Sequence, residues 1–295
     1  MQVKPLLAAA VLCLTAGAAQ AAEPVETVSA CGFRPLQFDL LRPSRKAAVA
    51  ASVPVPAVII VHGGSWLGGS RRDEAGLMRF FAAQGYLAMS IDYRLSAQAS
   101  FPAQIEDMKC AICWLQKHAA QYQADPDRIA AYGISAGAHL VALAAVSAGK
   151  WDDAGGEGGV QSRLRCAVLQ APPLDLPGWW QSADATQSGP MAPRYMLTRL
   201  FGQTYQQAPE RYAEASPASY AGKAAAGSLP AMLVIQGDQD ATIPPLQARQ
   251  FVRALQASGN RAELLAIPDG DHFGFGSQGA QVAAKLKEFL ASCLK

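Results

Sequence analysis

The chain has 295 residues and a formal net charge of +2, with 51% hydrophobic and 16% charged residues. A chain this long and this apolar can bury a sizeable core, which excludes a mainly disordered protein. The small net charge offers no basic surface for nucleic acid, so we expect no nucleic-acid partner.

The first 21 residues have the pattern of a secretory signal peptide. Lys4 supplies the positive start, residues 6–16 form a short apolar core, and Ala19-Gln20-Ala21 is a small-residue cleavage site. A membrane span needs about 20 apolar residues, so this run is too short, and no other segment is long enough. We expect cleavage after Ala21 and export to the periplasm or the extracellular space.

After this leader, strand-like and helix-like runs alternate along the chain. The run 55–64 is rich in β-branched residues and ends in glycines, which is typical of a strand buried on both faces. Strands are predicted at 55–64, 86–95, 128–135, 163–173, 229–240 and 261–271. Helices are predicted at 75–85, 104–122, 136–149, 245–259 and 281–294. This alternation predicts one α/β domain over residues 22–295, with a mainly parallel sheet flanked by helices.

One segment, 174–226, interrupts the alternation with prolines, polar residues and the pair Trp179 and Trp180. Loops this long inside a compact domain are usually functional or disordered. We expect a lid or pocket wall in which the two tryptophans contact substrate; a surface excursion that caps the sheet is the alternative.

Five cysteines remain once the leader is removed: Cys31, Cys110, Cys113, Cys166 and Cys293. Their number is odd, so at least one should stay outside any disulfide in an oxidising compartment. Cys110 and Cys113 form a CxxC pattern, but they lie inside a predicted helix, which favours buried packing or a structural disulfide over redox chemistry. The pairing is left open.

A serine between two glycines is the feature with the clearest chemical meaning. Gly133-Ile134-Ser135-Ala136-Gly137 lies between a predicted strand and a predicted helix. This is the setting of a nucleophile elbow, a turn so sharp that only small neighbours fit and the serine hydroxyl is raised above the sheet. Ser135 is therefore the candidate nucleophile, and the helix that follows directs backbone N–H groups towards developing negative charge.

A nucleophilic serine needs a base that is held by an acid. Of the four histidines, His272 alone follows a late strand on a loop; His118 is expected at the surface, His139 packed, and His62 holding its loop by hydrogen bonds. His272 is the candidate base.

Two aspartates, Asp238 and Asp240, follow the strand that ends near Gln236. The acid must leave the sheet and reach the histidine, which favours Asp240, the residue deeper in the loop. Asp238 is better placed to bind nearby backbone N–H groups. Asp269 and Asp271 are too close to His272 in sequence to orient its ring well.

Taken in order, the stretches 62–70, 91–95, 101–115, 125–140, 236–244 and 269–275 resemble the α/β-hydrolase esterases of the hormone-sensitive-lipase and feruloyl-esterase-like branch. The resemblance runs from about Val55 to the C-terminus. It implies an α/β-hydrolase fold, the triad Ser135, Asp240 and His272, and an oxyanion hole built from the N–H groups of Gly64, Ser65 and Ala136. It also implies a small-molecule ester substrate, with no metal and no cofactor.

The chain departs from that pattern at two positions where many relatives have glycine, Ser65 and Ala138. A backbone N–H survives either change, so the expected activity is not threatened, although Ser65 narrows the space beside the acyl carbon. The run Asp92-Tyr93-Arg94 is interpreted as structural, with Arg94 paired with Asp107.

The leading hypothesis is thus a secreted serine carboxylesterase that works through an acyl-enzyme. A prolyl-oligopeptidase-type peptidase shares the triad order, but about thirty residues before the first strand leave no room for its large N-terminal domain. A non-catalytic binding protein of the same fold usually lacks one triad member. The sequence leaves the acyl and alcohol specificity and the oligomeric state open.

Overall fold

The computed structural model describes residues 24–31, 36–43, 54–152 and 161–295. The predicted signal peptide and its cleavage site lie outside these described residues.

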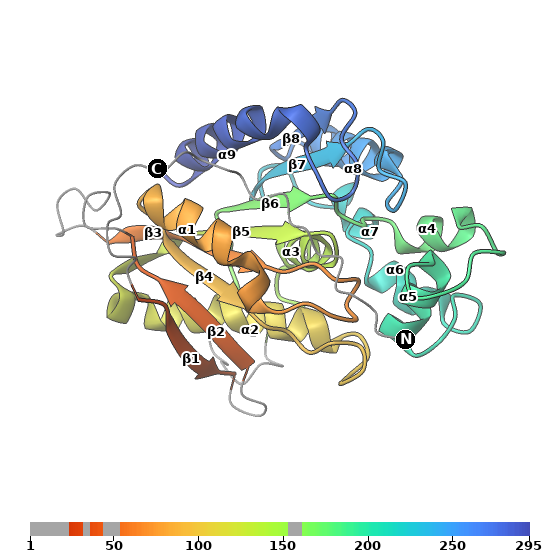
Figure 1. Ribbon diagram of the computed structural model, residues 1–295, viewed down its shortest axis with the longest axis horizontal. Coiled ribbons are helices and arrows are strands. Elements are labelled where there is room, and N and C mark those ends of the chain that lie inside the picture. Colours follow the sequence, from red (N-terminus) through yellow and green to blue (C-terminus); the bar gives the residue numbers. More distant parts are fainter. Residues whose placement is uncertain (1–23, 32–35, 44–53, 153–160) are drawn as a thin grey trace.

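Within the described ranges, eight strands form one sheet in the order β1-β2-β4-β3-β5-β6-β7-β8 (Figure 1). All neighbouring pairs from β4 to β8 are parallel, whereas β2 is antiparallel to both β1 and β4. The strands are β1 Glu26–Ala30, β2 Leu36–Leu41, β3 Val55–Val61, β4 Leu87–Ile91, β5 Ala124–Ile134, β6 Cys166–Gln170, β7 Ala231–Gly237 and β8 Ala262–Ile267. The mainly parallel sheet is confirmed; the sequence patterns did not predict β1 and β2.

Strand β3 is apolar along its length because helices cover both faces of the sheet. In β3, Ala57, Ile59 and Val61 pack into one core, while Val58 and Ile60 pack into the other. A strand buried on both faces reads as a continuous apolar run, which is how residues 55–64 read. Packing on both faces fixes these central strands, and the strands in turn position the loops at their carboxyl ends.

Helices α2, α3 and α8 contribute to the first core, and α1 and α9 contribute to the second. Their bounds are α1 Ala75–Ala83, α2 Ala103–His118, α3 Ala136–Val146, α8 Pro245–Ala257 and α9 Gly279–Cys293. Each predicted helix is therefore present. Within the described ranges, none is both long and apolar enough to cross a membrane.

Among the described residues, two disulfides join distant parts of the chain. Cys31, next to β1, bonds to Cys110 in α2, and Cys166 in β6 bonds to Cys293 at the end of α9. Cys113 belongs to neither bridge and is buried. The CxxC cysteines are thus not bonded to each other: Cys110 forms a structural disulfide and Cys113 is buried, the two roles that the sequence favoured over redox chemistry.

Segment 174–226 folds as four short helices between β6 and β7, which we call the cap (Figure 1, right). They are α4 Leu176–Ser182, α5 Pro193–Phe201, α6 Pro209–Glu214 and α7 Ala218–Ala221. The cap is tied to the loop before α2: the Phe101 N–H donates to the Leu200 carbonyl at 2.8 Å, and the Arg211 guanidinium donates to the Phe101 carbonyl.

Candidate active site

Ser135 occupies a strained turn between β5 and α3. Its backbone has φ 51° and ψ −116°, a conformation that L-residues rarely adopt and that is typical of functional sites. A Cβ at Gly133 would lie within 3.0 Å of Gly137 and Ala138, and one at Gly137 would lie within 3.0 Å of the Val61 and His62 carbonyls. Both glycines are therefore required by close backbone contacts around the serine.

The structure brings the three predicted triad residues together from three loops at the same edge of the sheet. His272 Nε2 lies 3.0 Å from Ser135 Oγ, and His272 Nδ1 lies 2.8 Å from Asp240 Oδ2. A carboxylate only accepts hydrogen bonds, so Nδ1 carries the proton and Nε2 presents its lone pair to the serine hydroxyl. This is the tautomer that a general base needs.

Asp240 is 5% exposed and accepts four hydrogen bonds. Oδ1 accepts from the N–H groups of Thr242 and Ile243 at 2.9 and 2.8 Å, while Oδ2 accepts from Gln236 Nε2 at 2.8 Å and from His272. Burial alone would raise the pKa of Asp240, but the hydrogen bond and charge of His272, with the Ile243 and Gln236 donors, hold this pKa below its usual value. The carboxylate therefore stays ionised beside His272.

Sequence reasoning missed Gln236, which steadies the acid from the end of β7. The sequence did carry a signal for this role, because Gln236 is the one polar side chain in the otherwise apolar strand β7.

The expected role of Asp238 was wrong. Its carboxylate does not bind backbone N–H groups within the described chain; it pairs with Arg249 in α8, with 2.6 Å between Oδ1 and Nη2. Asp271 Oδ1 accepts from the Phe273 and Gly274 N–H groups at 2.8 Å each, which fixes the loop after His272. Neither aspartate hydrogen-bonds the His272 ring, so Asp240 is the orienting acid in this geometry.

The loop that carries Gly64 and Ser65 follows β3 and lies beside Ser135. A Cβ at Gly63 would lie 3.5 Å from the Ser135 Cβ, which measures how close the two segments are. Gly64 and Ser65 both have positive φ, 108° and 57°, so their backbones turn sharply. In the part of the chain that the structure describes, neither N–H has a hydrogen-bond partner.

Ala136 is the first residue of α3, so its N–H has no acceptor within that helix. The three predicted oxyanion donors thus have no acceptor within the described ranges, and they lie on two segments that meet at the serine.

His62 and Tyr93 hold the Gly64–Ser65 loop in place. This role is the one that the sequence predicted for His62. The His62 ring stacks on Tyr93 with centroids 4.3 Å apart, and its Nδ1 donates to the Gly63 carbonyl at 2.7 Å. Burial lowers the pKa of His62, which keeps the ring neutral. The Tyr93 hydroxyl donates to the His62 carbonyl at 3.2 Å.

The residues that flank Tyr93 anchor the end of β4 by ion pairs. The predicted pair is confirmed: Arg94 Nη2 lies 2.7 Å from Asp107 Oδ1. Asp92 binds Arg71 Nη1 at 2.7 Å.

The other two histidines, His139 and His118, lie outside the triad and make packing contacts. His139 is fully buried and packed, as expected; its Nε2 donates to the Ala215 carbonyl at 2.7 Å, and its ring meets Trp66 edge-on. Burial lowers the pKa of His139 to about 4, so it is neutral at physiological pH. His118 is half-buried rather than fully at the surface, because its ring stacks on Trp114.

Trp179 and Trp180 lie in α4, inside the cap, and are only 3% and 5% exposed. Trp180 meets Tyr212 edge-on with centroids 5.6 Å apart, and the Arg194 guanidinium lies over its ring. Their predicted contact with substrate stays a prediction; the ring contacts of Trp180 are with cap residues, and both tryptophans belong to the first core.

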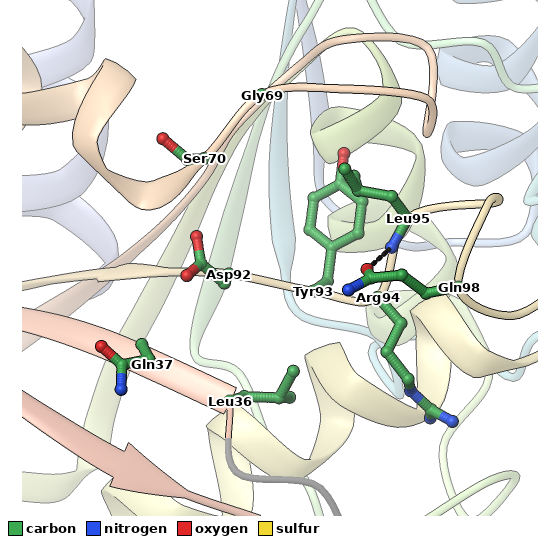
Figure 2. Close-up of a pocket in the computed structure, with 9 residues that line it drawn as sticks. All are labelled: Leu36, Gln37, Gly69, Ser70, Asp92, Tyr93, Arg94, Leu95 and Gln98. Atoms are coloured by element: carbon green, nitrogen blue, oxygen red, sulfur yellow. Dashed lines mark hydrogen bonds between the residues drawn. The ribbon is translucent and has the colours of Figure 1, made fainter.

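A pocket of about 270 Å³ lies beside the loop that follows β3 and carries Gly64 and Ser65 (Figure 2). Its walls include Gly69 and Ser70 from that loop and residues 92–95 after β4; the Leu95 N–H donates to Gln98 Oε1 on one side of it. No triad residue lines this pocket, so it is a neighbour of the candidate site and not its centre.

The comparisons with known proteins agree with this geometry. The sequence model of the BD-FAE family matches residues 43–255. Esterase LipQ of Mycobacterium tuberculosis is 32% identical over 77% of this chain and 52% of its own length. The chain spans about half the length of the curated relatives it matches.

Among solved structures, a truncated carbohydrate esterase from gut microbiota has a TM-score of 0.78 at 23% identity, covering 95% of this chain and 99% of its own; it shows the fold. Esterase 2 of Thermogutta terrifontis, solved phosphonylated by sarin, has a TM-score of 0.74 at 26% identity, covering 95% of this chain and 98% of its own. With the sheet order, the elbow and the family match in agreement, the chain belongs to the BD-FAE family and has the fold of the α/β-hydrolase esterases.

Proposed function

We propose that this protein is an exported serine carboxylesterase that hydrolyses small-molecule carboxylic esters through an acyl-enzyme. The observation that carries the proposal is the position of His272, whose two ring nitrogens lie 3.0 Å from Ser135 Oγ and 2.8 Å from Asp240 Oδ2. An isolated serine is a weak nucleophile, and this arrangement activates it.

In the first half of the reaction, Ser135 Oγ attacks the ester carbonyl carbon while His272 Nε2 takes the hydroxyl proton. Asp240 stabilises the resulting imidazolium, and the N–H groups of Gly64, Ser65 and Ala136 donate to the oxyanion. The carbonyl re-forms, the bond to the alcohol oxygen breaks, and His272 gives that oxygen its proton.

The second half repeats these steps with water. A water molecule gives a proton to His272 as it attacks the acyl carbon, and the tetrahedral intermediate collapses to release the acid and restore the Ser135 hydroxyl. The described residues supply every proton-transfer and charge-stabilising group that these steps use.

The relatives support the same reaction class. LipQ is named an esterase, and Esterase 2 of Thermogutta terrifontis is phosphonylated by sarin, an electrophile of the kind that activated serines attack at phosphorus. These activities belong to those proteins, and we extend them to this chain on the strength of its triad geometry.

Export is supported by two independent features. Residues 1–21 have the composition of a signal peptide. The two disulfides are typical of proteins that fold in an oxidising compartment. We propose that the mature protein acts in the periplasm or outside the cell.

A panel of p-nitrophenyl esters with acyl chains of increasing length, together with methyl ferulate and acetylated xylan, tests this function. The expected result is turnover of at least one ester that Ser135→Ala reduces by roughly three or more orders of magnitude. Ser228→Ala is the matched control, because this exposed serine only bonds the Ala225 carbonyl and should leave turnover unchanged. Equal activity of the wild type and Ser135→Ala on every ester would contradict the proposal.

A further inference from the structure

A few large hydrophobic side chains of the described chain are exposed to solvent. The large hydrophobic residues that the described chain exposes are Val25 53%, Met191 56%, Tyr195 44%, Leu246 58% and Phe273 60%. Met191 and Tyr195 belong to the cap, Leu246 lies in the first turn of α8, and Phe273 follows β8. Of the five, Phe273 alone is the direct neighbour of a triad residue in sequence.

Val25 lies at the opposite end of the sheet. It precedes β1, where Glu26 pairs with Leu40 of β2, and the neighbouring Leu41 pairs with Ala88 near the start of β4. Val25 is therefore exposed to a similar degree as the other four residues but lies at the other end of the sheet. Its substitution is a matched control for the loss of an exposed apolar side chain.

Phe273 has the most informative position of the set. It follows His272 directly, and the two rings meet edge-on with centroids 5.0 Å apart. The Asp271 carboxylate accepts from the Phe273 and Gly274 N–H groups, so the backbone that presents this ring is fixed. The ring is nevertheless 60% exposed, so it does little for the core.

The acid loop and the cap enclose a second hollow. A pocket of about 280 Å³ is bounded by Met191, Ala192 and Pro193 of the cap and by Ala241 and Thr242, the two residues after Asp240. The lining of this pocket is mixed, because Gln187, Ser188 and Thr242 add polar groups, so Phe273 is the exposed apolar side chain that lies directly beside a triad residue.

The proposed reaction decides which part of a substrate meets Phe273. His272 Nε2 must give its proton to the leaving alcohol oxygen, so that oxygen lies within hydrogen-bond reach of the imidazole. The group attached to it then extends past the residues that flank His272. Resting on the proposed esterase function, we propose that Phe273 forms the binding surface for the alcohol part of the ester, and that the preferred substrates are esters of apolar, ring-bearing alcohols.

Two ester series separate the alcohol side from the acyl side. The first varies the alcohol at a constant acetyl group, with methyl, cyclohexylmethyl and benzyl acetate. The second varies the acyl group at a constant methyl alcohol, with methyl acetate, butyrate and phenylacetate. The readout is the ratio of kcat/KM between the bulky and the small ester, which is insensitive to the fraction of active protein.

Phe273→Ala should lower the benzyl-to-methyl ratio of the acetates by about fivefold to tenfold, as expected for loss of one aromatic contact. The ratio in the acyl series should change much less. Val25→Ala, which removes an equally exposed apolar group elsewhere, should leave both ratios unchanged.

Three results would overturn the proposal. An unchanged alcohol ratio in Phe273→Ala would show that the ring does not contact the alcohol group. An equal loss on methyl and benzyl acetate would mean that Phe273 only positions His272. A larger change in the acyl series would place the acyl group there instead. Failure to hydrolyse any of the esters would overturn the proposed function itself, and that outcome is distinct from all three.

Discussion

Replacing Asp240 by asparagine tests how the acid controls the histidine tautomer. The amide oxygen can keep the bonds from the Thr242 and Ile243 N–H groups, which places the amide nitrogen opposite His272 Nδ1 and Gln236 Nε2. Nδ1 must then accept, and the ring proton moves to Nε2, where it faces Ser135 and cannot act as a base. Turnover should fall by about 10⁴-fold. Gln236 loses a buried acceptor, so the free energy of unfolding should fall by about 1–3 kcal/mol.

The assay is kcat for the best p-nitrophenyl ester, measured on variants whose folding is checked by circular dichroism. Asp238→Asn is the matched control: it breaks only the pair with Arg249, whose side chains are 31% and 49% exposed. Such surface pairs contribute about 1 kcal/mol or less, and turnover should be unchanged. If Asp238→Asn lost more turnover than Asp240→Asn at equal folding, the assignment of the acid would be wrong.

Three further variants test the scaffold. Burial raises the pKa of Glu74 from its ordinary value of 4.5 to about 7, so the folded state holds this proton more tightly than the unfolded state, and stability is lost as pH rises from about 4.5 to 7. Urea unfolding of Glu74→Gln should therefore show a gain of up to about 3 kcal/mol over the wild type at pH 8 and little gain at pH 4, and an equal effect at both would contradict this. Replacing both Cys166 and Cys293 by alanine opens a bridge between residues 127 positions apart and should lower the free energy of unfolding by about 4–5 kcal/mol, while an unchanged melting temperature would contradict a structural role. Trp180→Ala should cost about 3–5 kcal/mol because this side chain is buried in the cap, whereas an unchanged stability with an altered ester preference would favour the pocket wall expected from sequence.

The sequence predicted the parallel part of the fold and the grouping of the triad for the same physical reason. Parallel strands buried on both faces read as apolar runs, and their carboxyl ends meet at one edge. Ser135 and Asp240 follow such strands and His272 follows the parallel edge strand β8, so their placement in sequence was enough to group them. The antiparallel β1 escaped prediction because it is five residues long and mostly exposed, which leaves no apolar pattern.

What the sequence could not predict depended on contacts between segments. Asp238 follows a glycine, which suggested a local turn, but the partner that decides its role is Arg249 on the next helix. The adjacent Trp179 and Trp180 are apolar in either setting, so their position in sequence could not distinguish a pocket wall from the interior of the cap. The disulfide pairing likewise required the approach of β1 to α2 and of β6 to α9.

Labelling with a fluorophosphonate tests the central claim most directly, because the reagent reports an activated serine without assuming a substrate. We predict a single stoichiometric adduct, mapped to Ser135 by peptide mass spectrometry, that is absent in Ser135→Ala and forms much more slowly in Asp240→Asn. Absence of any adduct on the folded protein, or an adduct that persists in Ser135→Ala, would contradict the assignment of Ser135 as the nucleophile.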